Sequence, residues 1–148
     1  MLRILVMNGP NLNLLGVRER AVYGTQTLDD IEARVAAEAA DLGVEVTFFQ
    51  SNHEGALIDR LHAAMGEVDG VVFNPGAYTH YSYALRDAIA ATGLPVVEVH
   101  MSDITTREEF RAVSVTAPVC VTQVMGLGAD SYTVGLETLV DRLREDAP

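Results

Sequence analysis

Residues 8–24, "NGPNLNLLGVRERAVYG", combine side chains that can carry out acid–base chemistry directly behind an apolar run. A free tyrosine is a poor base at neutral pH because its pKa is about 10, but a nearby guanidinium favours the phenolate. Arg18 precedes Tyr23 closely, and Gly16 and Gly24 flank the segment as hinges. The pattern predicts a loop that brings phenol and guanidinium to a site while excluding water. Taken alone, it is equally typical of a surface loop with scattered arginines.

Polar residues also follow three of the predicted strands, in "NGPNLN", "NPGAYTH" and "VHMSD". Ligands of open parallel sheets bind beyond the carboxyl ends of the strands, so these ends should supply one site, with Asn11, Asn74, His80, His100 and Ser102. Each residue alone has a structural explanation, since asparagine before glycine or proline is typical of turns. Their convergence at one edge favours a functional site.

Five short apolar runs rich in β-branched residues predict strands at residues 3–8, 44–50, 70–74, 95–100 and 119–126. Stretches with helical spacing alternate with them, at residues 27–43, 54–65, 80–93 and 129–146, and a short helical turn is expected near Thr105. In the first helix Thr27 is the expected N-cap and Gly43 the C-terminal stop. In the last helix the side chains expected to face the core are Val134, Leu136, Leu139, Val140 and Leu143.

The alternation of strands and helices predicts the α/β class, a flavodoxin-like three-layer sandwich around a five-stranded parallel sheet of order 2-1-3-4-5. We see neither a linker nor an internal repeat, so residues 1–148 are expected to form a single catalytic domain.

Composition excludes several classes of function. The formal net charge is −11, which argues against binding to nucleic acid or to an acidic membrane surface. All 10 basic residues are arginine, and without lysine neither a Schiff base nor a Walker-type phosphate loop can form. No apolar run approaches the roughly 20 residues of a membrane span. The single Cys120 fits a reducing, cytoplasmic compartment and is expected to be a small buried apolar residue.

Familiar cofactor signatures do not fit the chain. The segment after the first strand has no G-x-G-x-x-G motif, and a flavin phosphate loop would be rich in serine and threonine. His53 and His62 have no cysteine ligands at metal spacing, which argues against a zinc site there. We expect neither a cofactor nor a metal.

Four motifs in the same order, "NGPNLNLLGVRERAVYG", "FFQSNHEGALIDRLH", "NPGAYTHYSYALRDA" and "PVVEVHMSDITTREEFR", resemble those of the type II 3-dehydroquinate dehydratases, or dehydroquinases. The resemblance covers nearly the whole chain. It implies a flavodoxin-like fold, no cofactor or metal, and a homododecamer built from trimers. It also implies a lyase that converts 3-dehydroquinate to 3-dehydroshikimate and water, in the shikimate pathway of aromatic amino acid biosynthesis or in the quinate pathway.

The same resemblance assigns roles to individual residues. It makes Tyr23 the catalytic base, Arg18 the lid arginine beside it, and Asn11 the residue that holds a water at the developing enolate. It makes His100 the general acid, with Glu98 supporting it two residues earlier on the same strand face. Substrate contacts are implied for Asn74, His80, Met101 (through its backbone), Ser102 and Arg111. Asp87 is implied to reach a neighbouring subunit's site, and Arg107 to lie near the chain's own site.

The chain departs from the family pattern at three places that border the expected pocket. "DITTR" brings Asp103 and Thr105 after Ser102, and "AVSV", residues 112–115, stands where the family usually has two histidines, a serine and a tyrosine. Tyr81 and Tyr83 replace the usual threonine and valine. Two other functions therefore stay open: a flavodoxin-like binding module without turnover, and a lyase acting on a related cyclic polyol acid.

Overall fold

The computed structural model describes residues 1–148 and contains one parallel sheet, whose strands are β1 (Arg3–Asn8), β2 (Glu45–Gln50), β3 (Gly70–Asn74), β4 (Val96–His100) and β5 (Thr122–Met125). The strand order is β2-β1-β3-β4-β5, which confirms the predicted flavodoxin-like topology. In the register, Asn8 at the end of β1 lies beside Gln50 of β2 and Asn74 of β3. Three amides therefore stand together where the central strands end.

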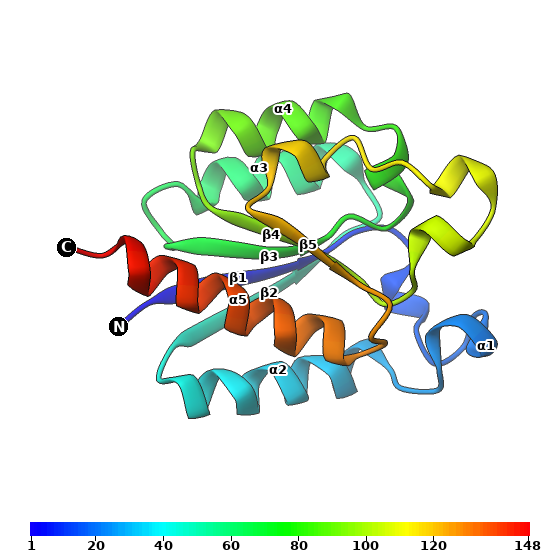
Figure 1. Ribbon diagram of the computed structural model, residues 1–148, viewed down its shortest axis with the longest axis horizontal. Coiled ribbons are helices and arrows are strands. Elements are labelled where there is room, and N and C mark those ends of the chain that lie inside the picture. Colours follow the sequence, from blue (N-terminus) through cyan, green and yellow to red (C-terminus); the bar gives the residue numbers. More distant parts are fainter.

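Helices cover both faces of the sheet (Figure 1). One face carries α2 (Leu28–Leu42) and α5 (Asp130–Asp146), and the other carries α3 (Glu54–Ala64) and α4 (Tyr83–Thr92). The one-turn helix α1 (Arg20–Tyr23) lies at the carboxyl edge of the sheet, and both chain termini lie at the opposite edge. None of the helices combines the length and the hydropathy that a membrane crossing requires.

Two apolar clusters hold the layers together, and alternation along the strands separates them. In β1, Ile4 and Val6 belong to the cluster under α2 and α5, whereas Leu5 and Met7 belong to the cluster under α3 and α4. Helix α2 begins and ends as its sequence predicts. A capping box joins Thr27 to Asp30, and Gly43 takes the left-handed conformation.

Two sequence predictions need correction. The fifth strand covers only Thr122–Met125, because Pro118 lies within a 3-10 turn, η5 (Ala117–Val119), that precedes it. Helix α5 buries Tyr132 and Gly135 in addition to Leu136, Leu139 and Val140; Leu143 is partly buried against the same cluster as expected, whereas Val134 is partly exposed and lies outside it. A Cβ at position 135 would lie 2.5 Å from Cγ1 of Val99, so α5 approaches β4 too closely for a larger residue.

Candidate active site

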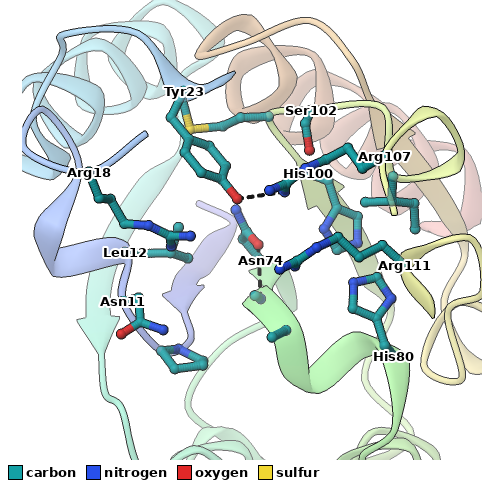
Figure 2. Close-up of a pocket in the computed structure, with 15 residues that line it drawn as sticks. Asn11, Leu12, Arg18, Tyr23, Asn74, His80, His100, Ser102, Arg107 and Arg111 are labelled. Carbon is teal, nitrogen blue, oxygen red and sulfur yellow. Dashed lines mark hydrogen bonds between the residues drawn. The ribbon is translucent and has the colours of Figure 1, made fainter. Parts of the chain in front are cut away.

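The loops that follow β1, β3 and β4 meet at the carboxyl edge of the sheet and enclose one pocket (Figure 2). The first two loops lie in direct contact, because a Cβ at Gly9 would come within 2.3 Å of the Pro75 carbonyl oxygen. Only glycine permits this approach, which places the Asn11 segment beside the Asn74 segment. Four 3-10 turns complete the walls: η1 (Leu12–Leu14), η2 (Gly76–His80), η3 (Ile104–Thr106) and η4 (Glu109–Arg111).

Asn11 has a left-handed backbone with φ of 67°, a conformation that asparagine tolerates better than most residues. Its N–H donates a hydrogen bond of 3.0 Å to Oδ1 of Asn52, and Nε2 of Gln50 donates to the same oxygen over 3.2 Å. The loop after β2 thus fixes the backbone of Asn11. The side chain lines the pocket, where its amide can donate to an oxyanion or to a water.

Tyr23 reaches the pocket from α1 and contacts two guanidinium groups. Nη1 of Arg107 donates a hydrogen bond of 2.7 Å to its phenolic oxygen (Figure 2). Cζ of Arg18 lies 4.7 Å from the centre of its ring. The carboxylate of Glu19 accepts from both arginines, over 3.3 Å from Arg18 and 3.2 Å from Arg107. Two guanidinium groups and one carboxylate thus surround the phenol of Tyr23.

His100 and Glu98 form a hydrogen-bonded pair at the floor of the pocket. Nε2–H of His100 donates a hydrogen bond of 2.9 Å to Oε2 of Glu98, whose side chain is completely buried. Burial alone would raise the pKa of the Glu98 carboxyl, but hydrogen bonding to His100, the charge of His100 and the hydroxyls of Thr116 and Ser114 outweigh it. The pKa of Glu98 therefore lies below its usual range. Nδ1 is left as the imidazole nitrogen available to a ligand.

Asn74 is held rigidly at the end of β3. Its Oδ1 accepts from the N–H of Gly76 over 3.1 Å, and its Nδ2 donates to the hydroxyl of Tyr132 over 2.9 Å. That hydroxyl donates in turn to Oδ1 of Asn8 over 2.6 Å. Burial raises the pKa of Tyr132, so it stays a neutral phenol that can serve as donor and acceptor at once. Sequence patterns did not point to this tyrosine, because it lies 58 residues from Asn74 on the last helix.

His80 lies at the end of η2 and enters the pocket from the side opposite Asn11 (Figure 2). Its Nδ1–H donates a hydrogen bond of 2.8 Å to the carbonyl of Val113, and its ring meets that of Phe110 edge-on. Burial and the neighbouring positive charge of His100 and Arg111 lower the pKa of His80, while the Val113 carbonyl opposes this change. The imidazole is neutral at neutral pH and can hydrogen-bond a ligand hydroxyl through Nε2.

Three arginines line the pocket, in a protein whose net charge is −11. Arg18 and Arg107 contact Tyr23, and Arg111 is oriented by a 2.7 Å hydrogen bond from its Nε to Glu108. Ser102 adds a hydroxyl from the loop after β4. The site can therefore hold a small anion that carries several hydroxyl groups.

The structure brings almost all predicted site residues together. The pocket is lined by Asn11, Arg18, Tyr23, Asn74, His80, His100, Met101, Ser102, Arg107 and Arg111. Glu98 lies behind His100, and Asp87 is exposed on α4, outside this chain's own pocket. Sequence reasoning missed the other lining residues, which are Pro10, Leu12, Gly76, Ala77 and Ile104. All of them neighbour predicted residues in the sequence and offer backbone or apolar surface. No three His, Cys, Asp or Glu side chains come together as a metal site.

Residues 2–140 match the family model described as dehydroquinase class II. The chain belongs to the type II dehydroquinase family. A 3-dehydroquinate dehydratase of Desulforudis audaxviator is 59% identical over 140 residues, which is 95% of this chain and 93% of the relative. One of Bacillus pumilus is 60% identical over 136 residues, 92% of each chain. The crystal structure of a type II dehydroquinase from Butyrivibrio crossotus matches with a TM-score of 0.91 at 46% identity, covering 93% of this chain and 97% of the other.

The segment at residues 112–115 contacts residues at and behind the pocket through its backbone and one serine. The carbonyl of Val113 accepts from His80, and the N–H of Val115 donates to the carbonyl of Thr79 over 2.7 Å. Ser114 donates to Glu98. In "DITTR", Oδ1 of Asp103 caps η3 through the N–H and hydroxyl of Thr105. These contacts hold both segments against the pocket.

Proposed function

We propose that the chain dehydrates 3-dehydroquinate to 3-dehydroshikimate through an enolate, in the shikimate pathway of aromatic amino acid biosynthesis or in the quinate pathway. One observation carries the proposal. A phenol bonded to a guanidinium and an imidazole bonded to a buried carboxylate, Tyr23 with Arg107 and His100 with Glu98, line the same pocket. This is a base and an acid at one site. The 3-dehydroquinate dehydratases at 59% and 60% identity support the same reaction.

The charges of the pocket suit this substrate. Dehydroquinate is a carboxylate with several hydroxyl groups, and Arg18, Arg107 and Arg111 supply positive charge where the rest of the protein is acidic. Ser102, His80 and Asn74 supply neutral hydrogen-bonding groups for the hydroxyls and the carboxylate.

The proposed reaction begins when the phenolate of Tyr23 removes a proton next to the substrate carbonyl. The electrons of that C–H bond pass to the carbonyl oxygen, and the resulting enolate is stabilised by Asn11, directly or through a held water. The carbonyl then reforms as the C–O bond two carbons away breaks, and His100 gives its proton to the leaving oxygen. Water departs, and Tyr23 and His100 recover their starting protonation states through solvent. No step of this scheme calls for a cofactor or a metal.

We also propose a single catalytic domain, residues 1–148, that works in the cytoplasm as a homododecamer of trimers. Exposed apolar side chains near the pocket support subunit contacts, since a monomer rarely exposes several together. Tyr81 and Tyr83 are 59% and 65% exposed, and Phe110 and Val113 are each 63% exposed. In such an assembly Asp87, exposed on α4, would contribute to a neighbour's site.

A spectrophotometric assay with 3-dehydroquinate tests the proposed activity, because the conjugated enone of dehydroshikimate absorbs where the substrate does not. Absorbance should rise with the purified protein and without added metal or cofactor. Binding of 3-dehydroquinate without an absorbance rise would instead indicate a binding module. Turnover only with a related cyclic polyol acid would change the substrate and keep the lyase chemistry.

A further inference from the structure

The carboxylate of Glu98 has three partners besides His100. Nε2 of Gln123 donates to its Oε2 over 2.7 Å, and Oγ of Ser114 donates over 2.9 Å to Oε2 and 3.1 Å to Oε1. The hydroxyl of Thr116 donates to Oε1. Since Glu98 is completely buried, an unpaired carboxylate would be costly there, and these three donors satisfy it.

The three donors come from outside the pocket. Gln123 lies opposite Glu98 in the register between β4 and β5, and Ser114 and Thr116 belong to the segment between η4 and η5. None of them lines the pocket that holds Tyr23 and His100. Their direct link to the pocket is Glu98, which bonds His100.

A third hydroxyl, that of Thr79, contacts both Ser114 and Thr116. Oγ1 of Thr79 lies 2.7 Å from Oγ of Ser114 and 2.8 Å from Oγ1 of Thr116, and Thr79 is completely buried. The N–H of Ala117 also donates to Oγ of Ser114, over 3.0 Å. Because Ser114 already accepts from Ala117, its single hydrogen is free for Glu98, and the one hydrogen of Thr79 can be given to Thr116, which leaves the Thr116 hydrogen for Glu98 as well. The amide nitrogen of Gln123 can only donate, so the network suits an ionised carboxylate.

We propose that Ser114, Thr116 and Gln123 are positioning residues that hold Glu98 ionised and oriented toward Nε2 of His100. Nδ1–H of His100 is then presented to the leaving oxygen of the substrate. This inference rests on the proposed function for its catalytic consequence, but the state of Glu98 can be measured independently.

Few other titratable or charged groups act on this pair. His80 approaches from η2, Arg111 from η4, and Cys120 follows η5. Burial raises the pKa of the Cys120 thiol to about 12, so it stays neutral, and the lowered pKa of His80 keeps that imidazole neutral near pH 7. Arg111 keeps a constant charge. A change in the titration of Glu98 therefore reports on its hydrogen-bond donors.

Thr116→Val tests the inference, because valine has nearly the same shape and lacks the hydroxyl. We expect kcat to fall about 10-fold or more with little change in KM, as a hydrogen bond to a charged group is lost outside the pocket. The titration of the Glu98 carboxyl, followed by ¹³C NMR of labelled glutamate, should move to higher pH. Thr116→Ser should restore both quantities. Gln123→Met removes a donor from the other side and should reproduce both changes.

Thr138→Val is the matched control. The hydroxyl of Thr138 donates to the carbonyl of Val134 within α5, so its loss should leave kcat and the Glu98 titration unchanged. Wild-type kcat and an unmoved carboxyl titration in both Thr116→Val and Gln123→Met would overturn the inference. If the wild-type protein does not convert 3-dehydroquinate, the proposed function fails, and the carboxyl titration still decides whether these residues hold Glu98 ionised.

Discussion

Arg107 donates a hydrogen bond of 2.7 Å from Nη1 to the phenolic oxygen of Tyr23, across 84 residues of sequence. Arg18, the closer arginine in sequence, contacts the face of the ring and not the oxygen. Nη2 of Arg107 also donates to Glu19, so one planar guanidinium joins residues 19–23 to the η3–η4 segment. The base of the proposed reaction is thus paired mainly with the arginine whose role was least defined by sequence.

Replacing Tyr23 by phenylalanine removes one oxygen and keeps the ring. If Tyr23 is the base, kcat should fall about 10²- to 10⁴-fold, with little change in KM, because the lost interaction acts mainly in the transition state. Steady-state kinetics with 3-dehydroquinate measure both constants. A variant that turns over at close to the wild-type rate would remove Tyr23 from the base role.

Arg107→Ala should lower kcat about 10- to 100-fold and should cost more than Arg18→Ala, since only Arg107 bonds the phenolic oxygen. Arg107→Lys should recover part of the loss, as an ammonium cannot bond Tyr23 and Glu19 with the same planar fork. Profiles of kcat against pH test this order.

Arg60→Ala serves as the control for these arginine variants. Arg60 pairs with Glu67 over 3.3 Å, and neither residue lines the pocket. Its profile should match that of the wild type. An equal effect of Arg18→Ala and Arg107→Ala would mean that general positive charge, and not the hydrogen bond, supports the base.

Borohydride added together with 3-dehydroquinate should leave the activity intact. The chain contains no lysine, so no side-chain imine can form with the substrate carbonyl and be reduced. Residual activity and the intact protein mass measure the outcome. Inactivation together with a protein adduct of substrate mass would contradict the proposed enolate mechanism.

The light-scattering mass of the protein should lie well above the 16.0 kDa of one chain. Asp87→Asn should then lower kcat/KM about 10-fold, although Asp87 is absent from its own chain's pocket. Asp59→Asn, at an exposed position on α3, should have no effect. A fully active monomer, or wild-type kinetics in Asp87→Asn, would rule out a site shared between subunits.

Stability should depend on Glu98 at acid pH. Because the pKa of Glu98 is lowered in the folded state, the unfolded state binds more protons as the pH falls below the ordinary value of 4.5. The stabilising contribution is present above that pH and is lost as the pH falls through the folded-state pKa. Glu98→Gln cannot titrate, so its free energy of unfolding should fall less steeply as the pH falls below 4.5. Urea unfolding at several pH values measures the slopes, and identical slopes would contradict the assignment.

The sequence by itself determined the elements and the edge at which the chemistry gathers. Apolar runs rich in β-branched residues define the strands and helical spacing defines the helices, and the N-cap at Thr27 and the stop at Gly43 are local signals. Because strand ends of a parallel sheet meet at one edge, the order of strands and helices along the chain is enough to place Asn11, Asn74 and His100 together. The absence of lysine excluded imine chemistry from composition alone.

Tertiary structure decided which of these groups touch. Arg107, Tyr132 and Gln123 lie 84, 58 and 25 residues from the side chains they bond, and no local spacing encodes such pairs. Their contacts follow from how α1 meets the η3–η4 segment, how α5 packs on the sheet and how β5 pairs with β4, and these depend on the apolar packing of every layer at once. Helix α5 shows the reason: it can bury Tyr132 against the sheet only because Gly135 lets its backbone approach Val99. Periodicity gives a helix its apolar stripe, and only the packed neighbour selects which residues of that stripe lie at the contact.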